Sequence, residues 1–193
     1  IPEEMQVSCQ ALMPQIKKVI TGFYASSSRY AENLPKEYTD AESRLEIDVP
    51  GHGNFANMLR AAAAGTGPFY SQVGIGTVIE EGREKRVFDG EVYLLFHPLK
   101  PDYALVRAHK ADRYGNLSYN GINRSGNPNF AAAAKTVIVE VDEIVEAGEL
   151  HHDQIITPAP FVDRIVGIEK CGKGSYEDLM NGFMGMMSIE EIR

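Results

Sequence analysis

The residues best suited to chemistry in this sequence are two glycines that flank a histidine, Gly51-His52-Gly53, between an expected strand and an expected helix. The first backbone N–H groups of a helix have no partner within it, and the helix dipole makes that end positive. The N–H groups of Gly53, Asn54 and Phe55 could therefore face a bound anion or a developing oxyanion. His52 adds a side-chain donor of the type that changes charge near neutral pH. This turn predicts a substrate-binding site.

A second pair of glycines, Gly74 and Gly76, follows another expected strand. In open α/β sheets, ligands bind beyond the carboxyl ends of the strands. If the two strands are parallel neighbours, their turns form two walls of a cleft with His52 between them. The alternative, that these glycines only end their strands, stays open. The candidate binding residues are therefore His52, Gly53, Asn54, Gly74 and Gly76.

The first turn also matches the G-x-G-x-x-G/A pattern of dinucleotide-binding proteins through Gly51, Gly53 and Ala56. That function needs an acidic residue at the end of the next strand, about 20 residues further on, to bind the ribose. The next expected strand ends near Val73, and no carboxylate follows before Glu80. A nicotinamide or flavin is therefore not expected. A tight strand-to-helix turn that binds nothing is the other alternative.

Two polar clusters have simpler interpretations than catalysis. Lys110, Asp112, Arg113 and Asn116 follow a strand, and such a charged loop is typical of a solvated turn, here with an Asp–Arg pair inside it. The histidines of 151–153 are adjacent in sequence, so their side chains project in different directions. We expect no metal site in this chain.

The elements that position these residues alternate between strand and helix patterns, which predicts an α/β fold with an open, mostly parallel sheet flanked by helices. Some antiparallel hairpin character is expected between Phe69 and Ala108, with a turn at Asp89-Gly90. Asn54 is expected to cap a helix that ends at Gly65. The remaining expected elements are strands at 18–23, 45–49, 69–73, 92–96, 102–108 and 136–141, and helices at 3–13, 129–134 and 188–192.

The length and charge of the chain narrow its class. A chain of 193 residues fits one domain, expected over 1–171, followed by a glycine- and methionine-rich extension over 172–193. The formal net charge of -8 argues against binding of nucleic acid. The spacing of Cys9 and Cys171 fits neither a metal site nor a redox motif, as is usual in a reducing compartment. No apolar segment approaches the roughly 18 residues of a membrane span, and no secretory signal is present. We therefore expect a cytoplasmic protein.

Several segments resemble the alpha (A) subunits of family I CoA-transferases that act on 3-oxoacids and 3-oxoadipate. Phe69–Thr77, FYSQVGIGT, is similar to their F-x-T-P-T-G-Y-G-T segment, and Ala108–Leu117, AHKADRYGNL, is similar to A-x-K-A-D-R-x-G-N. The resemblance runs from about Lys17 to Val166, and its motifs agree in order and spacing. Further similar segments are 134–150, 155–158 and 161–166.

The resemblance implies an α/β sheet of the CoA-transferase type and a heterotetramer with a B-type subunit. The substrates would be acyl-CoA and a carboxylate, without a cofactor. The catalytic glutamate, which forms an acyl anhydride and then a glutamyl-CoA thioester, would come from the B-type partner. Glu80, Glu81 and Glu146 precede glycines here, but they match alpha-subunit segments that are not the nucleophile. The alternatives are a hydrolase or ring-opening enzyme of the same fold, and a non-catalytic module that binds CoA esters.

Two departures from the family pattern are visible. His52 stands where the 3-oxoacid enzymes have the glutamine of P-Q-G, whose amide reaches the active site. We expect His52 to supply the same hydrogen-bond donor, and the alternative is a histidine in a surface turn. The glycine-rich G-G-F-G turn and the S-N-N-A-G segment of the family have no counterpart here, so we expect this sequence to lack the N-terminal strand that carries the first of them.

Overall fold

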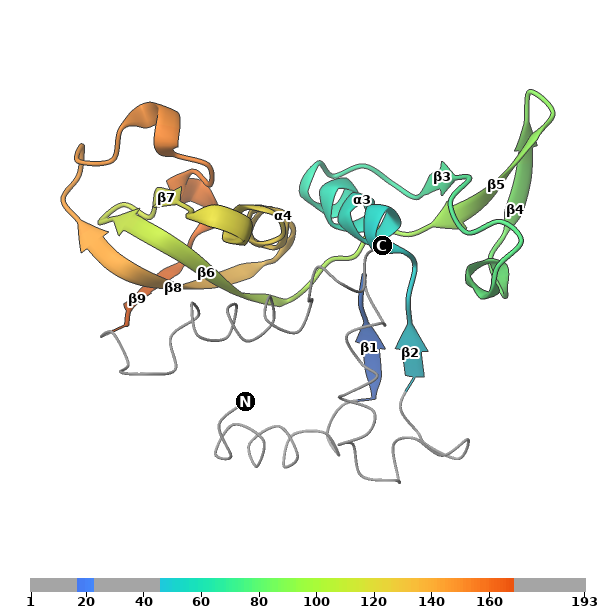
Figure 1. Cartoon of the computed structure of the whole chain (residues 1–193), viewed down its shortest axis with the longest axis horizontal. Helices are drawn as coiled ribbons and strands as arrows, with labels where there is room; N and C mark the ends of the chain where they lie inside the picture. The colour runs from blue at the N-terminus through green and yellow to red at the C-terminus, as the bar shows by residue number, and fades with distance from the viewer. Residues whose placement is uncertain (1–16, 23–45, 169–193) are drawn as a thin grey trace, which may run out of the picture. The chain divides into compact units, whose positions relative to one another are not determined.

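The computed structural model describes residues 17–22 and 46–168, which Figure 1 draws in colour. The described residues from Lys17 to Gly167 belong to one compact unit. The helices expected at 3–13 and 188–192, and the extension expected at 172–193, lie outside the described residues. None of the described helices combines the length and apolarity needed to cross a membrane.

The described strands form a two-stranded, a three-stranded and a four-stranded sheet. In chain order, the strands are β1 (Lys18–Ile20), β2 (Glu46–Asp48), β3 (Phe69–Ser71), β4 (Lys85–Phe88), β5 (Glu91–Phe96), β6 (Tyr103–Asp112), β7 (Leu117–Ser118), β8 (Thr136–Val145) and β9 (Arg164–Gly167). The helices are α3 (His52–Ala63) and α4 (Asn127–Ala133), with the 3-10 turns η3 (Val78–Glu80), η4 (Gly121–Arg124), η5 (His152–Gln154) and η6 (Ala159–Phe161).

Strands β1 and β2 form the parallel pair that leads into the site. The expected strands at 18–23 and 45–49 are confirmed, although both are shorter than predicted. Their carboxyl ends lie at the same edge, because Val19 pairs with Ile47 in parallel register and the N–H of Thr21 donates to the Asp48 carbonyl at 3.1 Å. Helix α3 begins four residues after β2 ends. The Gly51-His52-Gly53 segment therefore follows a strand and opens a helix, as predicted, and that strand belongs to a parallel pair.

Helix α3 begins at His52, three residues before the start that a cap at Asn54 would give. Gly51 is the N-cap residue instead, with a φ of 87° that side chains rarely allow. Asn54 does not cap the helix, because its side chain is buried and donates its hydrogen bonds elsewhere. The alanine-rich helix ends at Ala63, just before the predicted stop at Gly65.

Strands β3, β5 and β4 form an antiparallel sheet in that order. The hairpin expected at Asp89-Gly90 is confirmed: both residues have positive φ angles, 51° and 84°, as the tight turn between β4 and β5 requires. Leu94 and Phe96 of β5 are fully buried against Met58 of α3, and the Phe96 ring stacks on another aromatic ring of β3. This sheet therefore supports α3 from one side.

The two glycine-bearing strands are not parallel neighbours, which was the condition for a cleft between their turns. Strand β2 pairs with β1, whereas β3 pairs antiparallel with β5. A short strand pattern predicts extended backbone but does not identify its neighbour, and β3 is close in sequence to the hairpin that pairs with it. The two glycine turns are therefore not brought together by adjacent parallel strands.

The largest sheet has the order β7-β6-β8-β9, with β6, β8 and β9 parallel and β7 antiparallel. Alternate residues of β6 and β8 are buried on one face, where Ala131 of α4 joins the same core. The buried strand expected at 136–141 is therefore confirmed, and it extends to Val145. This packing fixes the position of α4, which forms one wall of the candidate site.

The charged loop after β6 is a structural turn organised by Asp112, which is 3% exposed. Its carboxylate accepts hydrogen bonds from the backbone N–H groups of Tyr114, Gly115 and Asn116 at 2.9–3.0 Å, and from the Asn116 amide at 2.7 Å. The structural interpretation is confirmed, but the expected Asp–Arg pair is wrong. Arg113 instead pairs with a glutamate beyond β8, at 2.6 Å.

We expect Asp112→Ala to lower the free energy of unfolding by about 2–4 kcal/mol, because it leaves buried N–H donors without an acceptor. Burial raises the pKa of Asp112, but its hydrogen bonds from Asn116, Tyr114 and Gly115 lower it further, so the net pKa lies below the usual value. The carboxylate therefore stabilises the fold above about pH 3.9 and loses this effect as the pH falls through the lower folded pKa.

Urea titrations of wild type and Asp112→Ala at pH 7 and at lower pH values test this prediction. The difference in stability should be largest at pH 7 and shrink as the medium becomes acidic. Asp102→Ala is the matched control, because that carboxylate is exposed on the surface in a pair with Lys135. Equal losses for the two variants at pH 7 would contradict the role given to Asp112.

Candidate functional site

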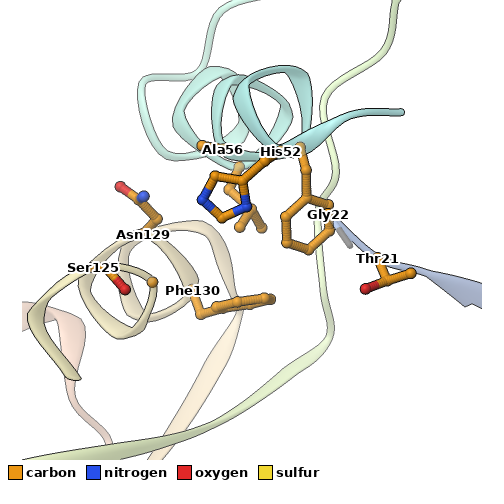
Figure 2. A pocket seen from close by; sticks show the side chains of 10 residues that line it. Thr21, Gly22, His52, Ala56, Ser125, Asn129 and Phe130 are labelled. Atoms are coloured by element: carbon orange, nitrogen blue, oxygen red, sulfur yellow. The ribbon is translucent and has the colours of Figure 1, made fainter. Parts of the chain in front are cut away.

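A pocket of about 240 Å³ lies at the carboxyl end of β1, between helices α3 and α4 (Figure 2). This is the place where open α/β sheets bind ligands. Three segments that are far apart in sequence meet there. The lining residues are Thr21, Gly22, His52, Phe55, Ala56, Leu59, Ser125, Gly126, Asn129 and Phe130.

His52 is the one of the five predicted binding residues that lines this pocket. It is the first residue of α3, and Figure 2 shows its ring directed between the two helices, with the Asn129 side chain across from it. The ring lies directly beside Gly22. A Cβ atom on Gly22 would stand 2.8 Å from the His52 Nδ1 atom, closer than non-bonded atoms approach. The position of the imidazole therefore depends on the absence of a side chain at Gly22.

The N-terminal turn of α3 is suited to negative charge. It has no acidic residue and no side-chain cap, and the N–H of Phe55 donates to the Gly51 carbonyl at 2.9 Å. A Cβ atom on Gly53 would meet nothing within 4 Å, so the described residues leave open space beside this residue. The backbone of Gly53 and Asn54 is thus placed as expected for contact with an anion, and its contact with substrate stays a prediction.

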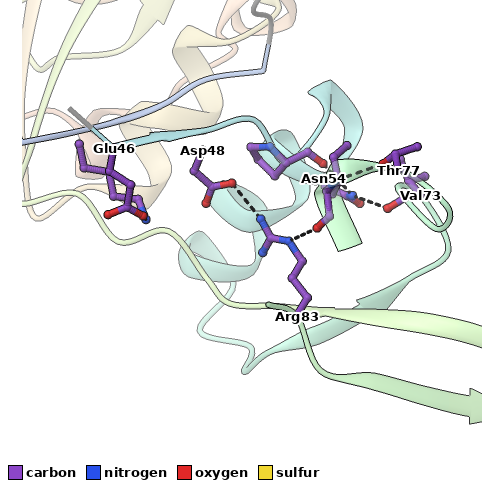
Figure 3. A network of polar contacts seen from close by, with 9 residues as sticks. Glu46, Asp48, Asn54, Val73, Thr77 and Arg83 are labelled. Carbon is purple, nitrogen blue, oxygen red and sulfur yellow. Dashed lines mark hydrogen bonds and ion pairs between the residues drawn. The ribbon is translucent and has the colours of Figure 1, made fainter. Parts of the chain in front are cut away.

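Asn54 joins the two glycine turns through its buried side chain, which is 1% exposed. Its Nδ2 atom donates to the carbonyl oxygens of Pro50 at 3.0 Å and Val73 at 3.1 Å, as Figure 3 shows for the second bond. Its Oδ1 atom has no hydrogen-bond partner among the described residues. The side-chain amide therefore holds the turns together, and the backbone N–H of Asn54 stays the candidate for contact with substrate.

The loop that carries Gly74 and Gly76 is held by bonds within the protein. The N–H of Gly76 donates to the Glu80 carboxylate at 2.8 Å, and the Thr77 hydroxyl donates to the Gly74 carbonyl at 2.7 Å. The hydrogen bond from Gly76, followed by that from Lys85, lowers the pKa of Glu80. A substrate role for Gly74 and Gly76 stays a prediction, and the N–H of Gly76 already has a partner.

Comparison with known proteins decides the family. Residues 3–167 match the family described as Coenzyme A transferase. The chain belongs to the coenzyme A transferase family. A curated relative, the A-type subunit of 3-oxoadipate CoA-transferase from Pseudomonas putida, is 40% identical over 173 residues, which are 89% of this chain and 73% of that protein. The alpha subunit of acetate CoA-transferase from Escherichia coli K12 is 42% identical over 79% of this chain and 66% of its own length. The resemblance to alpha (A) subunits is confirmed.

The chain spans about two thirds of the length of many of the curated coenzyme A transferase subunits that it matches. Solved structures confirm the α/β fold. An acyl-CoA transferase of Escherichia coli O157:H7 has a TM-score of 0.67 at 21% identity over 81% of this chain and 33% of its own. Glutaconate coenzyme A-transferase of Acidaminococcus fermentans has a TM-score of 0.65 at 19% identity, over 83% of this chain and 58% of its own.

Arg83 links β2 and η3, which lie next to the two glycine turns. The sequence alone did not identify this residue as a candidate. Its guanidinium donates to Asp48 at the end of β2 and to the Ile79 carbonyl of η3, both at 2.9 Å (Figure 3). It also lies over the Phe96 ring, 4.5 Å from the ring centre. A planar group with several donors suits these three contacts at once. Arg83 therefore supports the strand that leads into the His52 turn.

His151, His152 and Asp153 bring three possible metal ligands within 4.8 Å of one another. All three residues are exposed, and the His151 Nδ1 atom already accepts a hydrogen bond from the Asp153 N–H at 3.3 Å. The two rings stack with their centres 4.1 Å apart, so the expectation that these side chains project in different directions is wrong. This arrangement is typical of a surface turn, and the absence of a metal stays a prediction.

Proposed function

We propose that this chain is the alpha (A) subunit of an acyl-CoA:carboxylate CoA-transferase that moves CoA between an acyl-CoA and a 3-oxoacid or related carboxylate. The observation that carries the proposal is the position of His52, beside a pocket and at the positive end of α3. The B-type subunit supplies the glutamate, in a heterotetramer. The relatives are themselves named as one kind of subunit of their enzymes, which supports a partner of this kind. We place the complex in the cytoplasm.

The proposed reaction proceeds through the partner's glutamate. Its carboxylate attacks the thioester carbonyl and expels CoA thiolate, leaving an acyl-glutamyl anhydride. The thiolate then attacks the glutamyl carbonyl of the anhydride and releases the first carboxylate, leaving glutamyl-CoA. The acceptor carboxylate reverses these two steps and leaves as the new acyl-CoA, so no cofactor is consumed.

This chain acts on the charge that forms in these steps. Each attack moves negative charge onto a carbonyl oxygen, and donors aimed at that oxygen lower the barrier most effectively. His52 offers an N–H of its ring, and the first turn of α3 offers backbone N–H groups and a positive dipole. Neither the ring nor the backbone forms or breaks a covalent bond during the reaction. His52 therefore takes the place of the family's glutamine amide.

Two alternatives remain testable. A decarboxylase, AibA/AibB, has the same fold at a TM-score of 0.58, so the fold alone does not determine the reaction. A hydrolase or ring-opening enzyme would use water where the transferase uses an acceptor carboxylate. A non-catalytic module would bind CoA esters and turn over none of them.

The direct test is CoA exchange by the purified complex of this chain with its B-type partner. Acetyl-CoA or succinyl-CoA is supplied with acetoacetate, and product CoA esters and free CoA are separated by chromatography. We expect acetoacetyl-CoA to form, with no accumulation of free CoA. The isolated B-type partner, and a complex in which the partner's glutamate is changed to glutamine, should form none. Release of free CoA without transfer would favour the hydrolase. Binding of CoA esters without turnover would favour the non-catalytic module.

A further inference from the structure

The pocket beside His52 has an apolar part that both helices form. Phe55, Ala56 and Leu59 come from α3 and Phe130 comes from α4. The rings of Phe55 and Phe130 meet edge to face, with their centres 5.8 Å apart. Leu59 is 1% exposed, so this side of the pocket continues into the interior of the protein. The walls favour an apolar group of the substrate.

The polar side chains other than His52 that line the pocket cannot carry a charge. Thr21, Ser125 and Asn129 contribute hydroxyl and amide groups, and Figure 2 shows the Ser125 and Asn129 side chains on the α4 side. Among the ten described residues that line the pocket, His52 is the only one with an ionisable side chain. Neutral donors and acceptors of this kind suit a keto oxygen.

Size and solvation together point to one class of acyl group. A volume of about 240 Å³ equals the share of roughly eight water molecules, so the pocket suits a short acyl chain. Each methylene buried against such walls improves binding roughly fourfold. A carboxylate at the far end of the chain would instead contact the apolar walls away from His52, where no described lining residue can carry a positive charge to pair with it.

We propose that this pocket binds the acyl chain, and that the enzyme prefers short monocarboxylic acids over dicarboxylic acids of the same length. The proposal rests on the proposed function, and it names the substrate class of the same site. It also separates this chain from the relative named for 3-oxoadipate, which is a dicarboxylate. The apolar walls, rather than His52, determine this preference.

The test compares two acceptors that differ only at the far end, 3-oxohexanoate and 3-oxoadipate. The complex with the B-type partner is assayed for kcat/KM with each acceptor and one fixed acyl-CoA donor. We expect 3-oxohexanoate to be favoured at least tenfold. Transfer to 3-oxoadipate with equal or greater kcat/KM would overturn the proposal. Transfer to neither acceptor, nor to acetoacetate, would overturn the proposed function instead.

A cation placed on the pocket wall gives an independent test of the location. Asn129→Arg sets a guanidinium in the pocket, and Asn129→Gln is the matched neutral control. We expect the arginine variant to shift the ratio of the two kcat/KM values toward 3-oxoadipate by at least tenfold, and the glutamine variant to leave the ratio within about twofold of wild type. An unchanged ratio in a folded, active Asn129→Arg complex would show that the acyl chain binds elsewhere.

Discussion

In the complex with its B-type partner, His52→Ala is expected to lower kcat for CoA transfer by about 100-fold, with a much smaller change in KM for the acyl-CoA. Removal of one donor to a developing oxyanion costs about 100- to 1,000-fold in other enzymes. The lost interaction is strongest when the carbonyl oxygen carries charge, so the rate of the chemical step should fall more than ground-state binding. Steady-state kinetics with both substrates varied measures the two effects separately.

Two variants make this prediction specific to the ring. His52→Gln restores an N–H donor at the position where the family has glutamine, and it should recover kcat to within about tenfold of wild type. His97→Ala removes an exposed histidine outside the pocket and should have no effect. Wild-type kcat in His52→Ala would show that His52 is a surface-turn residue. Equal loss in the alanine and glutamine variants would show that the donor is not the contribution of this side chain.

The position of His52 could be predicted because its determinants are local. A strand followed by Gly51 and a helix pattern places the turn at a strand end, whatever the strand pairs with. The same reasoning predicted the end of the helix to within two residues, at Gly65 where the helix ends at Ala63, and predicted Asp89-Gly90 as a hairpin turn. Each of these features depends on the backbone preferences of a few adjacent residues.

The partners of these segments could not be predicted, because they are set by packing between distant parts of the chain. Nothing in the pattern of β3 distinguishes β2 from β5 as its neighbour. Asparagine is a residue type that often caps helices, yet the Asn54 side chain is buried and donates to the carbonyl of Val73, so it links the two turns instead. Arg83 is one of several basic residues in its segment, and only the fold brings it to Asp48.

The walls of the pocket were missed for the same reason. Phe55 and Phe130 belong to helices that lie far apart in the sequence, and each resembles an ordinary core residue in sequence. Asn129 lies in a helix without charged neighbours that would mark a site. The motifs identified the family and the kind of subunit, whereas the substrate class is argued from side chains that no motif contains.

Gly22→Ala is expected to lower kcat by about 30- to 100-fold, although residue 22 itself carries no functional group. The added Cβ atom would stand 2.8 Å from the His52 Nδ1 atom and 3.3 Å from its Cα atom, so the ring must move. A displacement near 1 Å of a catalytic group can cost about 100-fold. Gly126→Ala is the matched control: residue 126 lines the same pocket, and among the described residues its Cβ atom would meet only the Phe130 ring, at 3.9 Å.

The decisive measurement is the effect of Gly22→Ala in a second background, His52→Gln. A flexible glutamine can turn away from the new methyl group, so the penalty should fall to less than about fivefold, and the two substitutions should be strongly coupled in a double-mutant cycle. A purely structural role for Gly22 would give the same penalty in both backgrounds. Strong coupling between the two substitutions would instead show that Gly22 acts through the imidazole of His52, because the ring can reach the carbonyl oxygen only where residue 22 has no side chain.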